Sequence, residues 1–369
     1  MDINAIGIIG ANNSGAGAAE LLVKNGLQVR LYDDFKDSLN VALAKIAWSL
    51  RQAGKEELLG NIEGVQELSK FSGADIVIEA AAKQPEERKH LFDKLAPHLD
   101  PHCLVAARCE VHPLGELLAS AELPAERVLG FHFIKPVRSN QLVELVRTDR
   151  TADAHMETAA GLLRRIGKTP IMVKDNPGQI VERLRRPFLL AGLRLLEAGK
   201  GYPHEIDAAF REVAQAPAGP FETADFLGLD SDFRACEAIH AALGSPERLA
   251  PSQTQRRLVQ YGQLGRKSTI GFYIYEEGRI AGENPALPNL IKYLGLKKTS
   301  KEELFSEIMR PVVEEARLLA SEIMASEYDI ETAAKLGFGW PRGPFGYGRE
   351  MPGLLEKKKV SEFDRLDTF

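Results

Sequence analysis

The first 175 residues alternate between short apolar runs and longer stretches in which apolar positions recur at helical spacing. The apolar runs have the length of strands, and the stretches between them have the length of helices. Such alternation predicts an α/β fold with a largely parallel sheet and helices on both faces. The expected strands are residues 5–10, 27–33, 74–81, 103–107, 127–133, 141–146 and 169–175, and the expected helices are 15–25, 86–95, 114–121 and 153–166, with a further amphipathic stretch from Asp37.

The pattern changes at DNPGQ (175–179), after which it is helical, with little strand signal until GFYIY (271–275), and holds a repeat. A shift of 124 positions places GPF at 219–221 on GPF at 343–345, and RP at 186–187 on RP at 310–311. The offset is constant without a gap, and the second copy has no counterpart of LGRKSTIGFYIY. We therefore predict three domains: an α/β domain (1–176), an all-α domain (177–298) and a truncated repeat of the all-α domain (299–369).

The first strand leads into a glycine turn and a helix, in the stretch IGIIGANNSGAGAAELLVKNG. This is the pattern of a Rossmann-type dinucleotide site, in which a pyrophosphate lies at a helix N-terminus. Gly10 and Gly15 hold the first and third positions of the G-x-G-x-x-G fingerprint, but Asn12 holds the second. Asp33 ends the second strand, where an acid accepts hydrogen bonds from the adenosine ribose and repels a 2′-phosphate. Asp33 would alternatively cap the next helix; we favour the ribose role.

Composition excludes several classes of protein. A net charge of −5 argues against a nucleic-acid partner, and no apolar run approaches the ~20 residues that a membrane span needs. The first strand begins so early that no signal peptide fits before it, so we expect a cytoplasmic protein. The three cysteines and the PHLDPHC segment lack the spacing of metal ligands, and we predict no metal site.

A histidine and a glutamate interrupt two otherwise apolar strands. Glu144 shares a strand face with Leu142 and Val146, which indicates a buried carboxylate, and His132 in the preceding strand is its natural partner. So paired, Glu144 would fix the tautomer of the imidazole and leave its other nitrogen free to move a proton. The same two residues would also make a purely structural pair, and spacing alone leaves both roles open.

The order of motifs resembles the L-3-hydroxyacyl-CoA dehydrogenase family. The resemblance rests on the glycine turn, DIVIEA, GFHFIKPVRSNQLVELV, VKDNPGQIVERL, AGPFETADFLGLD and GRKSTIGFYIY, which span residues 5–276 in the family's order. The region from residue 300 onward is similar to the duplicated C-terminal domain of longer members. Single-copy members pair their helical domains in a dimer, so the resemblance implies a monomer with an internal pseudo-dimer, or a homodimer.

The resemblance implies NAD as cofactor and an acyl-CoA thioester as substrate. His132 matches the histidine of the family's HFFNP, which abstracts the hydroxyl proton while hydride passes to NAD. Glu144 matches the glutamate of LVEVV, which orients that histidine. The residues assigned to the cofactor site are Gly10, Asn12, Gly15, Asp33 and Glu79.

Three polar positions near the reacting group depart from the family. The serine of ASNTSSL falls on Glu110, or on Val111 if a one-residue insertion is moved. The asparagine of FIVNRL is Glu182, and the asparagine of HFFNP is Lys135. Compared with the family motifs, the pair of His132 and Glu144 is therefore kept, whereas the polar residues around it are replaced by charged residues.

Several cations lie in the same segments, and two of them suit an anion. Lys135 and Arg138 directly follow the strand of His132, where they would bind a carboxylate on the acyl chain. Lys135 would alternatively donate to the 3-oxygen in place of the lost serine. We therefore expect substrate contacts from Glu110, Lys135, Arg138 and Glu182. A catalytically silent relative that binds nucleotide or CoA ligands as a subunit or regulator is the competing hypothesis.

Overall fold

The computed structural model describes residues 2–81, 85–118, 122–291, 298–322 and 325–351. The chain divides into two compact units. The first comprises Met1–Arg183 with two short additions, Ala241–Leu243 and Ile323–Gly337, and the second comprises the remaining segments.

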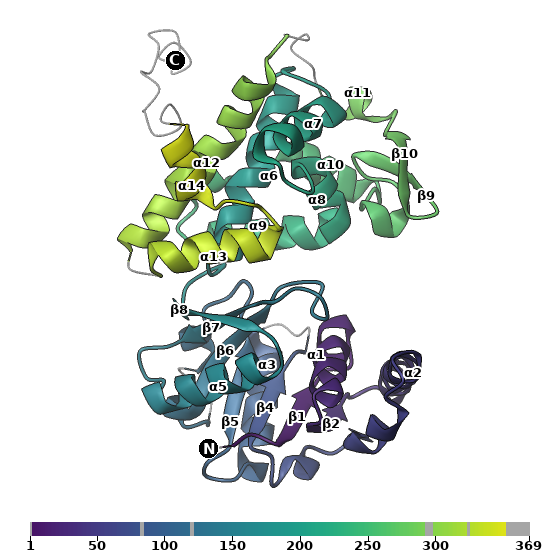
Figure 1. The fold of residues 1–369 in the computed structure, drawn as a ribbon, viewed down its shortest axis with the longest axis vertical. Helices are drawn as coiled ribbons and strands as arrows, with labels where there is room; N and C mark the ends of the chain where they lie inside the picture. Colours follow the sequence, from purple (N-terminus) through teal and green to yellow (C-terminus); the bar gives the residue numbers. More distant parts are fainter. Residues whose placement is uncertain (1, 82–84, 119–121, 292–297, 323–324, 352–369) are drawn as a thin grey trace. The chain divides into compact units, whose positions relative to one another are not determined.

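The first unit is built on an eight-stranded sheet in the order β3-β2-β1-β4-β5-β6-β7-β8 (Figure 1). All neighbouring strands are parallel except β6 and β7, which are antiparallel. The predicted, largely parallel sheet is thus confirmed. The strands are β1 (Ala5–Ile9), β2 (Gln28–Tyr32), β3 (Ile62–Val65), β4 (Ile76–Glu79), β5 (Leu104–Arg108), β6 (Val128–Phe133), β7 (Leu142–Arg147) and β8 (Thr169–Lys174).

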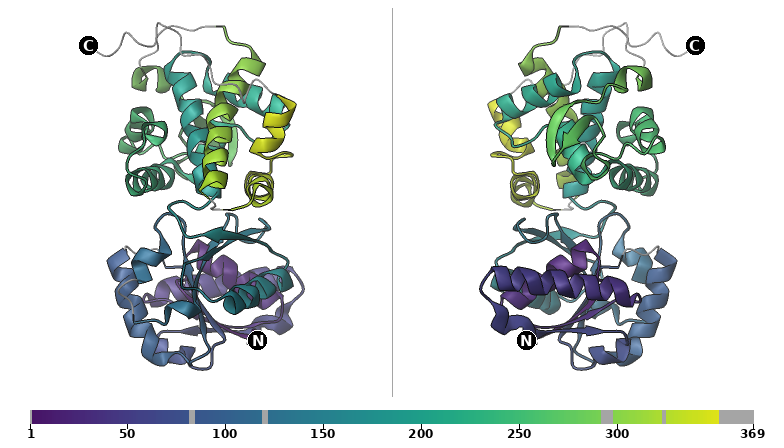
Figure 2. Two further views of the ribbon diagram at one scale, coloured as in Figure 1. Left: turned by 90° about the vertical axis from the view of Figure 1, so that its left-hand side faces the viewer. Right: turned by 90° about the vertical axis from the view of Figure 1, so that its right-hand side faces the viewer.

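Helices cover both faces of this sheet, as the alternating pattern predicts (Figure 2). One apolar core joins the sheet to α1 (Asn13–Lys24), α2 (Lys36–Gln52) and α5 (Asp153–Arg165). A second core joins the other face to α3 (Pro85–Leu95) and α4 (Leu114–Leu118). Short 3₁₀ turns complete the unit, namely η1 (Glu56–Asn61), η2 (Leu68–Phe71), η3 (Ala96–His98) and η4 (Ala125–Arg127).

Beyond β8 the chain is largely helical, with one hairpin. The helices are α6 (Val181–Glu197), α7 (Pro203–Ala214), α8 (Pro220–Leu227), α9 (Leu229–Ala242), α10 (Gln253–Gln260), α11 (Leu287–Leu290), α12 (Lys301–Ser321), α13 (Glu327–Phe338) and α14 (Pro344–Glu350), with 3₁₀ turns η5 (Glu247–Leu249) and η6 (Arg266–Ser268). Strands β9 (Tyr273–Glu276) and β10 (Arg279–Glu283) pair antiparallel. None of the described helices is long and apolar enough to cross a membrane.

Within the second unit, α12 and α14 share an aromatic core with α6 and α7. The ring of Phe210 lies 4.8 Å from Phe188, 5.7 Å from Phe305 and 5.5 Å from Trp340, and the Tyr347 hydroxyl donates to the carbonyl of Ala214. If the predicted repeat packs against the first helical domain, Leu318, Leu319 and Ile323 should lie at the contact; of these, Leu319 is buried and Leu318 is half-buried. Ile323 lies outside the described residues.

Two pairs of helices related by the predicted repeat, α7 with α13 and α8 with α14, start 124 positions apart. Helix α13 has the same length as α7, 12 residues, and starts 124 positions later. The glycines before α8 and α14 have nearly the same backbone angles, with φ of −89° at Gly219 and −90° at Gly343. Both α6 and α12 contain a proline, Pro187 and Pro311.

Candidate active site

The glycine turn brings two backbone segments into close contact at the carboxyl end of β1. Gly10 has a φ of +106°, a conformation that favours glycine. At Gly15, a Cβ atom would lie 1.9 Å from the carbonyl oxygen of Gly10, so only glycine fits. The turn therefore brings the first N–H groups of α1 to the edge of the sheet where a dinucleotide binds.

Asn12 directs its side chain back into the protein. Its Oδ1 accepts hydrogen bonds from the backbone N–H groups of Ser14 and Gly15, at 2.9 and 3.2 Å, and so caps α1. Its Nδ2 donates to the carbonyl of Ala80 at 2.6 Å. The asparagine thus ties the start of α1 to the end of β4.

Asp33 and Glu79 lie at the ends of the strands that flank β1. Asp33 accepts from the N–H groups of Ala11 and Phe35, at 2.7 and 3.0 Å, and so joins the glycine turn to the entrance of α2. The ribose role of Asp33 stays a prediction, and the N-cap of α2 is Phe35, which carries no side-chain cap hydrogen bond. Glu79 is bound through Oε2 by Arg88 at 2.6 Å.

These residues fit a dinucleotide on structural grounds. The close approach of Gly10 and Gly15 leaves no room for a side chain at Gly15. The Oε1 atom of Glu79 is buried and has no hydrogen-bond partner among the described residues, so a ligand donor would satisfy it. Arg88 is a supporting residue that the sequence did not reveal, because a single arginine in a polar helix carries no distinctive spacing.

His132 and Glu144 face each other directly across β6 and β7. The His132 Nδ1 atom is hydrogen-bonded to Oε2 of Glu144, and both side chains are buried. The other carboxylate oxygen, Oε1, accepts from the N–H groups of Ile180 and Val181, at 2.8 and 2.9 Å. These donors lie at the start of α6, where the helix dipole favours a negative charge. The predicted pairing of His132 with Glu144 is present. Backbone N–H groups support it, and a pattern of side chains cannot predict such support.

The environment of His132 favours its charged form. Burial by itself lowers the pKa of the imidazole. The hydrogen bond and charge of Glu144, together with the charges of Glu110 and Glu182, act in the opposite direction and outweigh burial. The pKa of His132 is therefore raised above its ordinary value.

Glu110 and Glu182 converge on the same imidazole. One oxygen of each carboxylate and a ring nitrogen of His132 all lie within 4.8 Å of one another. Glu182 is buried in the first turn of α6, while Glu110 is half-buried after β5. Glu110 and Glu182, two of the residues predicted to contact substrate, are therefore brought together at the predicted catalytic residue.

The two cations expected to bind substrate are engaged by protein carboxylates. The Nζ atom of Lys135 lies 3.5 Å from Glu110, beside His132, and its side chain is 53% exposed. Arg138 instead pairs at 2.6 Å with the buried Glu20 of α1. Lys135 therefore contacts the cluster around His132, whereas Arg138 contacts α1, the helix that follows the glycine turn.

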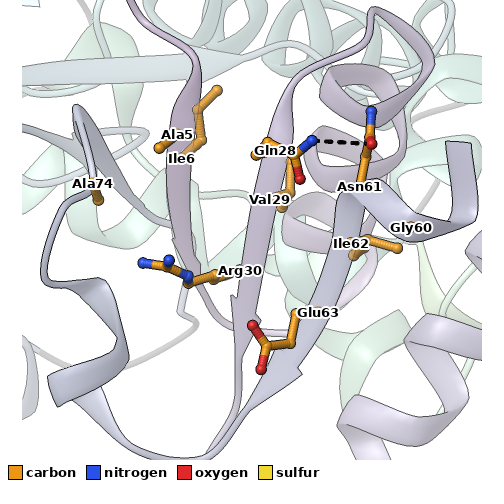
Figure 3. A pocket seen from close by; sticks show the side chains of 10 residues that line it. All are labelled: Ala5, Ile6, Gln28, Val29, Arg30, Gly60, Asn61, Ile62, Glu63 and Ala74. Atoms are coloured by element: carbon orange, nitrogen blue, oxygen red, sulfur yellow. Dashed lines mark hydrogen bonds between the residues drawn. The ribbon is translucent and has the colours of Figure 1, made fainter.

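The hollow drawn in Figure 3 lies at the amino-terminal ends of the strands, opposite to the end that carries the glycine turn. It has a volume of about 270 Å³ and is lined at the starts of β1, β2 and β3, with Gln28, Arg30 and Glu63 around it. Ligands of open parallel sheets bind at the carboxyl ends of strands. This hollow is therefore not the dinucleotide site.

Comparisons with known proteins identify the family. A model of the 3-hydroxyacyl-CoA dehydrogenase NAD-binding domain matches residues 5–176, and one of its C-terminal domain matches residues 178–275. The chain is 32% identical, over 277 residues, to a probable 3-hydroxybutyryl-CoA dehydrogenase of Deinococcus radiodurans, covering 73% of this chain and 99% of that protein.

Two solved structures are similar as well. One is a 3-hydroxybutyryl-CoA dehydrogenase of Escherichia coli, with a TM-score of 0.84 and 26% identity over 95% of this chain and 92% of that one. The other is an (S)-3-hydroxybutyryl-CoA dehydrogenase of Ralstonia eutropha, with a TM-score of 0.71 and 29% identity over 75% of this chain and 100% of that one.

Proposed function

Because the chain belongs to the 3-hydroxyacyl-CoA dehydrogenase family, we propose that it interconverts a 3-hydroxyacyl-CoA and the 3-ketoacyl-CoA with NAD. The observation that carries this proposal is the buried pair of His132 and Glu144, braced by the first N–H groups of α6. A silent relative would have no need to hold a buried imidazole in a single orientation.

Among the described residues, one group would bind the cofactor and another would transfer the proton. NAD, when bound, accepts or supplies the hydride. The turn at Gly10 and Gly15 would hold its pyrophosphate, Asp33 its adenosine ribose, and Glu79 a donor near the end of β4. Asn12 would act indirectly, by fixing the start of α1.

His132 would move the proton. Because Glu144 accepts the Nδ1–H group, the Nε2 atom is left to take a proton from the substrate hydroxyl or to return one to the ketone. Glu144 fixes the tautomer and stabilises the imidazolium that forms. The backbone donors of α6 keep Glu144 in place during that change of charge.

For the acyl group, we propose a chain that carries its own carboxylate. Lys135 supports this choice, since its exposed ammonium group stands next to the cluster around His132. Arg138 contributes indirectly, through its pair with Glu20, which secures the loop that carries Lys135. Glu110 and Glu182 would face the reacting end of the substrate.

The test is a screen of hydroxyacyl-CoA and ketoacyl-CoA thioesters, dicarboxylic ones included, that follows NADH absorbance. We expect turnover that His132→Gln abolishes. Lys135→Ala should penalise only acidic substrates, mainly through KM, if Lys135 binds their carboxylate; a fall in kcat for every substrate would make it a donor to the 3-oxygen. If no thioester reacts and NAD still binds, the silent-relative hypothesis replaces the enzyme.

We also propose that the segment from residue 299 is a truncated copy of the helical domain and supplies within one chain the partner that a dimer would provide. The matching bounds of α7 and α13 and the shared core of Phe210 and Phe305 support this. Deletion of residues 299–369 should expose that core and cause aggregation or new dimerisation, measured by light scattering after size-exclusion chromatography. A soluble, folded monomer would contradict the proposal.

A further inference from the structure

Three carboxylates surround the imidazole of His132 from different elements. Glu144 comes from β7 and is bonded to Nδ1. Glu182 comes from α6, and Glu110 follows β5; one oxygen of each lies within 4.8 Å of the other and of a ring nitrogen. Since Nδ1 is engaged by Glu144, Nε2 is the nitrogen that remains for these two.

Carboxylates at these positions change what the site offers to a substrate oxygen. An ionised carboxylate only accepts hydrogen bonds, so neither Glu110 nor Glu182 can replace a hydroxyl or amide donor to a carbonyl oxygen. The donor that such an oxygen then needs is the imidazolium of His132. Two negative groups beside the ring favour that charged form.

We propose that Glu110 and Glu182 are positioning residues that keep a proton on His132, so that the site meets its substrate as an acid and works best in the reductive direction. This inference rests on the proposed function and specifies it. In the step, the hydride of NADH adds to C3 of a 3-ketoacyl thioester, and the C=O π electrons move to the oxygen. That oxygen then takes the proton of His132 Nε2, which leaves NAD⁺, the 3-hydroxyacyl thioester and a neutral imidazole.

Two cations beside Glu110 offset its charge only in part. Lys135 and Arg108 both lie beside Glu110, with nitrogen–oxygen distances of 3.5 and 3.3 Å. Their side chains are 53% and 36% exposed, so solvent screens much of their charge, whereas Glu144 and Glu182 are buried. Glu144 from β7, Glu110 after β5 and Glu182 from α6 all act to raise the pKa of His132, and on balance that pKa is raised.

The direct test is NMR titration of the histidine side chains in the ligand-free protein. The resonance of His132 is identified among the eight histidines by its loss in His132→Gln. Glu110→Gln and Glu182→Gln each remove one charge while keeping the shape of the side chain. Each should lower the titration midpoint of His132 by about one pH unit. Glu63→Gln removes an exposed charge at the opposite end of the sheet and should leave the midpoint unchanged.

Kinetics supply the second readout. In the wild type, kcat/KM for ketone reduction should stay constant through neutral pH and fall at higher pH, where His132 loses its proton. Over the same range, kcat/KM for oxidation should rise. The pH at which each profile changes slope, called its break, should be lower in Glu110→Gln and Glu182→Gln. A purely structural role would reduce rates without moving the breaks.

Three results would overturn the proposal. One is a His132 midpoint at or below the ordinary value of about 6.5. Another is a midpoint that neither glutamine variant moves. The third is displacement of the His132 proton by added Zn²⁺ or Mn²⁺ at micromolar concentration, which would make the cluster a metal site. Because the titration needs no turnover, an inactive protein with a raised His132 midpoint would disprove the proposed function and the reductive direction with it, while the effect of Glu110 and Glu182 on the proton of His132 would stand.

Discussion

The glycine turn and the cluster around His132 belong to the same unit but are built from different groups. At the turn, which is made of backbone, Asn12 stands at the second position of the dinucleotide fingerprint and directs its side chain into local hydrogen bonds. At the cluster, which is made of side chains, Glu110 and Glu182 place their carboxylates next to a buried imidazole. A side chain at the turn can therefore leave the backbone site unchanged, whereas each side chain at the cluster changes the charge that the imidazole meets.

The largest effect should come from His132→Gln, which removes the proton carrier and leaves the glycine turn untouched. We expect kcat to fall about 10⁴-fold or more, the upper end of what general acid–base catalysis contributes. The dissociation constant for NADH, measured by fluorescence titration, should change less than about threefold. A comparable loss of NADH binding would show that the two sites are not independent.

Glu144→Gln should have the next largest effect, because it weakens orientation and imidazolium stabilisation but keeps His132. We expect a drop in kcat of about 10²-fold, less than for His132→Gln. The pKa of His132 should fall as well, since the bonded negative charge is lost, so the kinetic breaks move to lower pH. Steady-state rates across pH 5 to 10 check both points; an unchanged kcat would remove Glu144 from the mechanism.

Asp33→Asn tests the cofactor side by removing the charge of the carboxylate that binds the glycine turn. The wild type should bind NAD at least tenfold more tightly than NADP, because a 2′-phosphate would lie against the carboxylate. The substitution should weaken NAD about tenfold, the value of one charged hydrogen bond, and reduce the discrimination. Calorimetric titration of both cofactors provides the measurement, and tighter binding of NADP by the wild type would contradict the assignment.

Asn12→Gly should have the smallest effect. Replacing an asparagine cap by glycine costs only a few tenths of a kcal/mol, so the melting temperature should change by about a degree or less. NAD affinity should stay within about threefold of the wild type. A loss of tenfold or more would mean that Asn12 contacts the cofactor itself.

Most strands of the α/β domain could be predicted because their apolar runs are continuous. Strands β3 (IEGV) and β10 (RIAGE) were not predicted, because both are short, contain glycine and are largely exposed. Helix α1 begins at residue 13 rather than 15, since Asn12 caps it.

The antiparallel pairing of β6 with β7 could be predicted from the sequence. Only eight residues, 134–141, join the two strands, and a parallel crossover needs a dozen or more. This pairing sets His132 opposite Glu144, the contact that alternation along the strands predicts. The N–H donors of Ile180 and Val181 carry no side-chain signal, and the meeting of Glu110 with Glu182 depends on tertiary structure. Neither could be deduced from spacing.

The two backbone hydrogen bonds to Glu144 have a consequence for recombination and gene fusion. The family models meet near residue 177, but the donors to Glu144 lie at residues 180 and 181, and the first compact unit extends to Arg183. A chimera spliced at 177 would take those donors from a foreign parent, while a splice after 183 would transplant the buried pair with its support. The module that can be exchanged is therefore longer than the α/β domain.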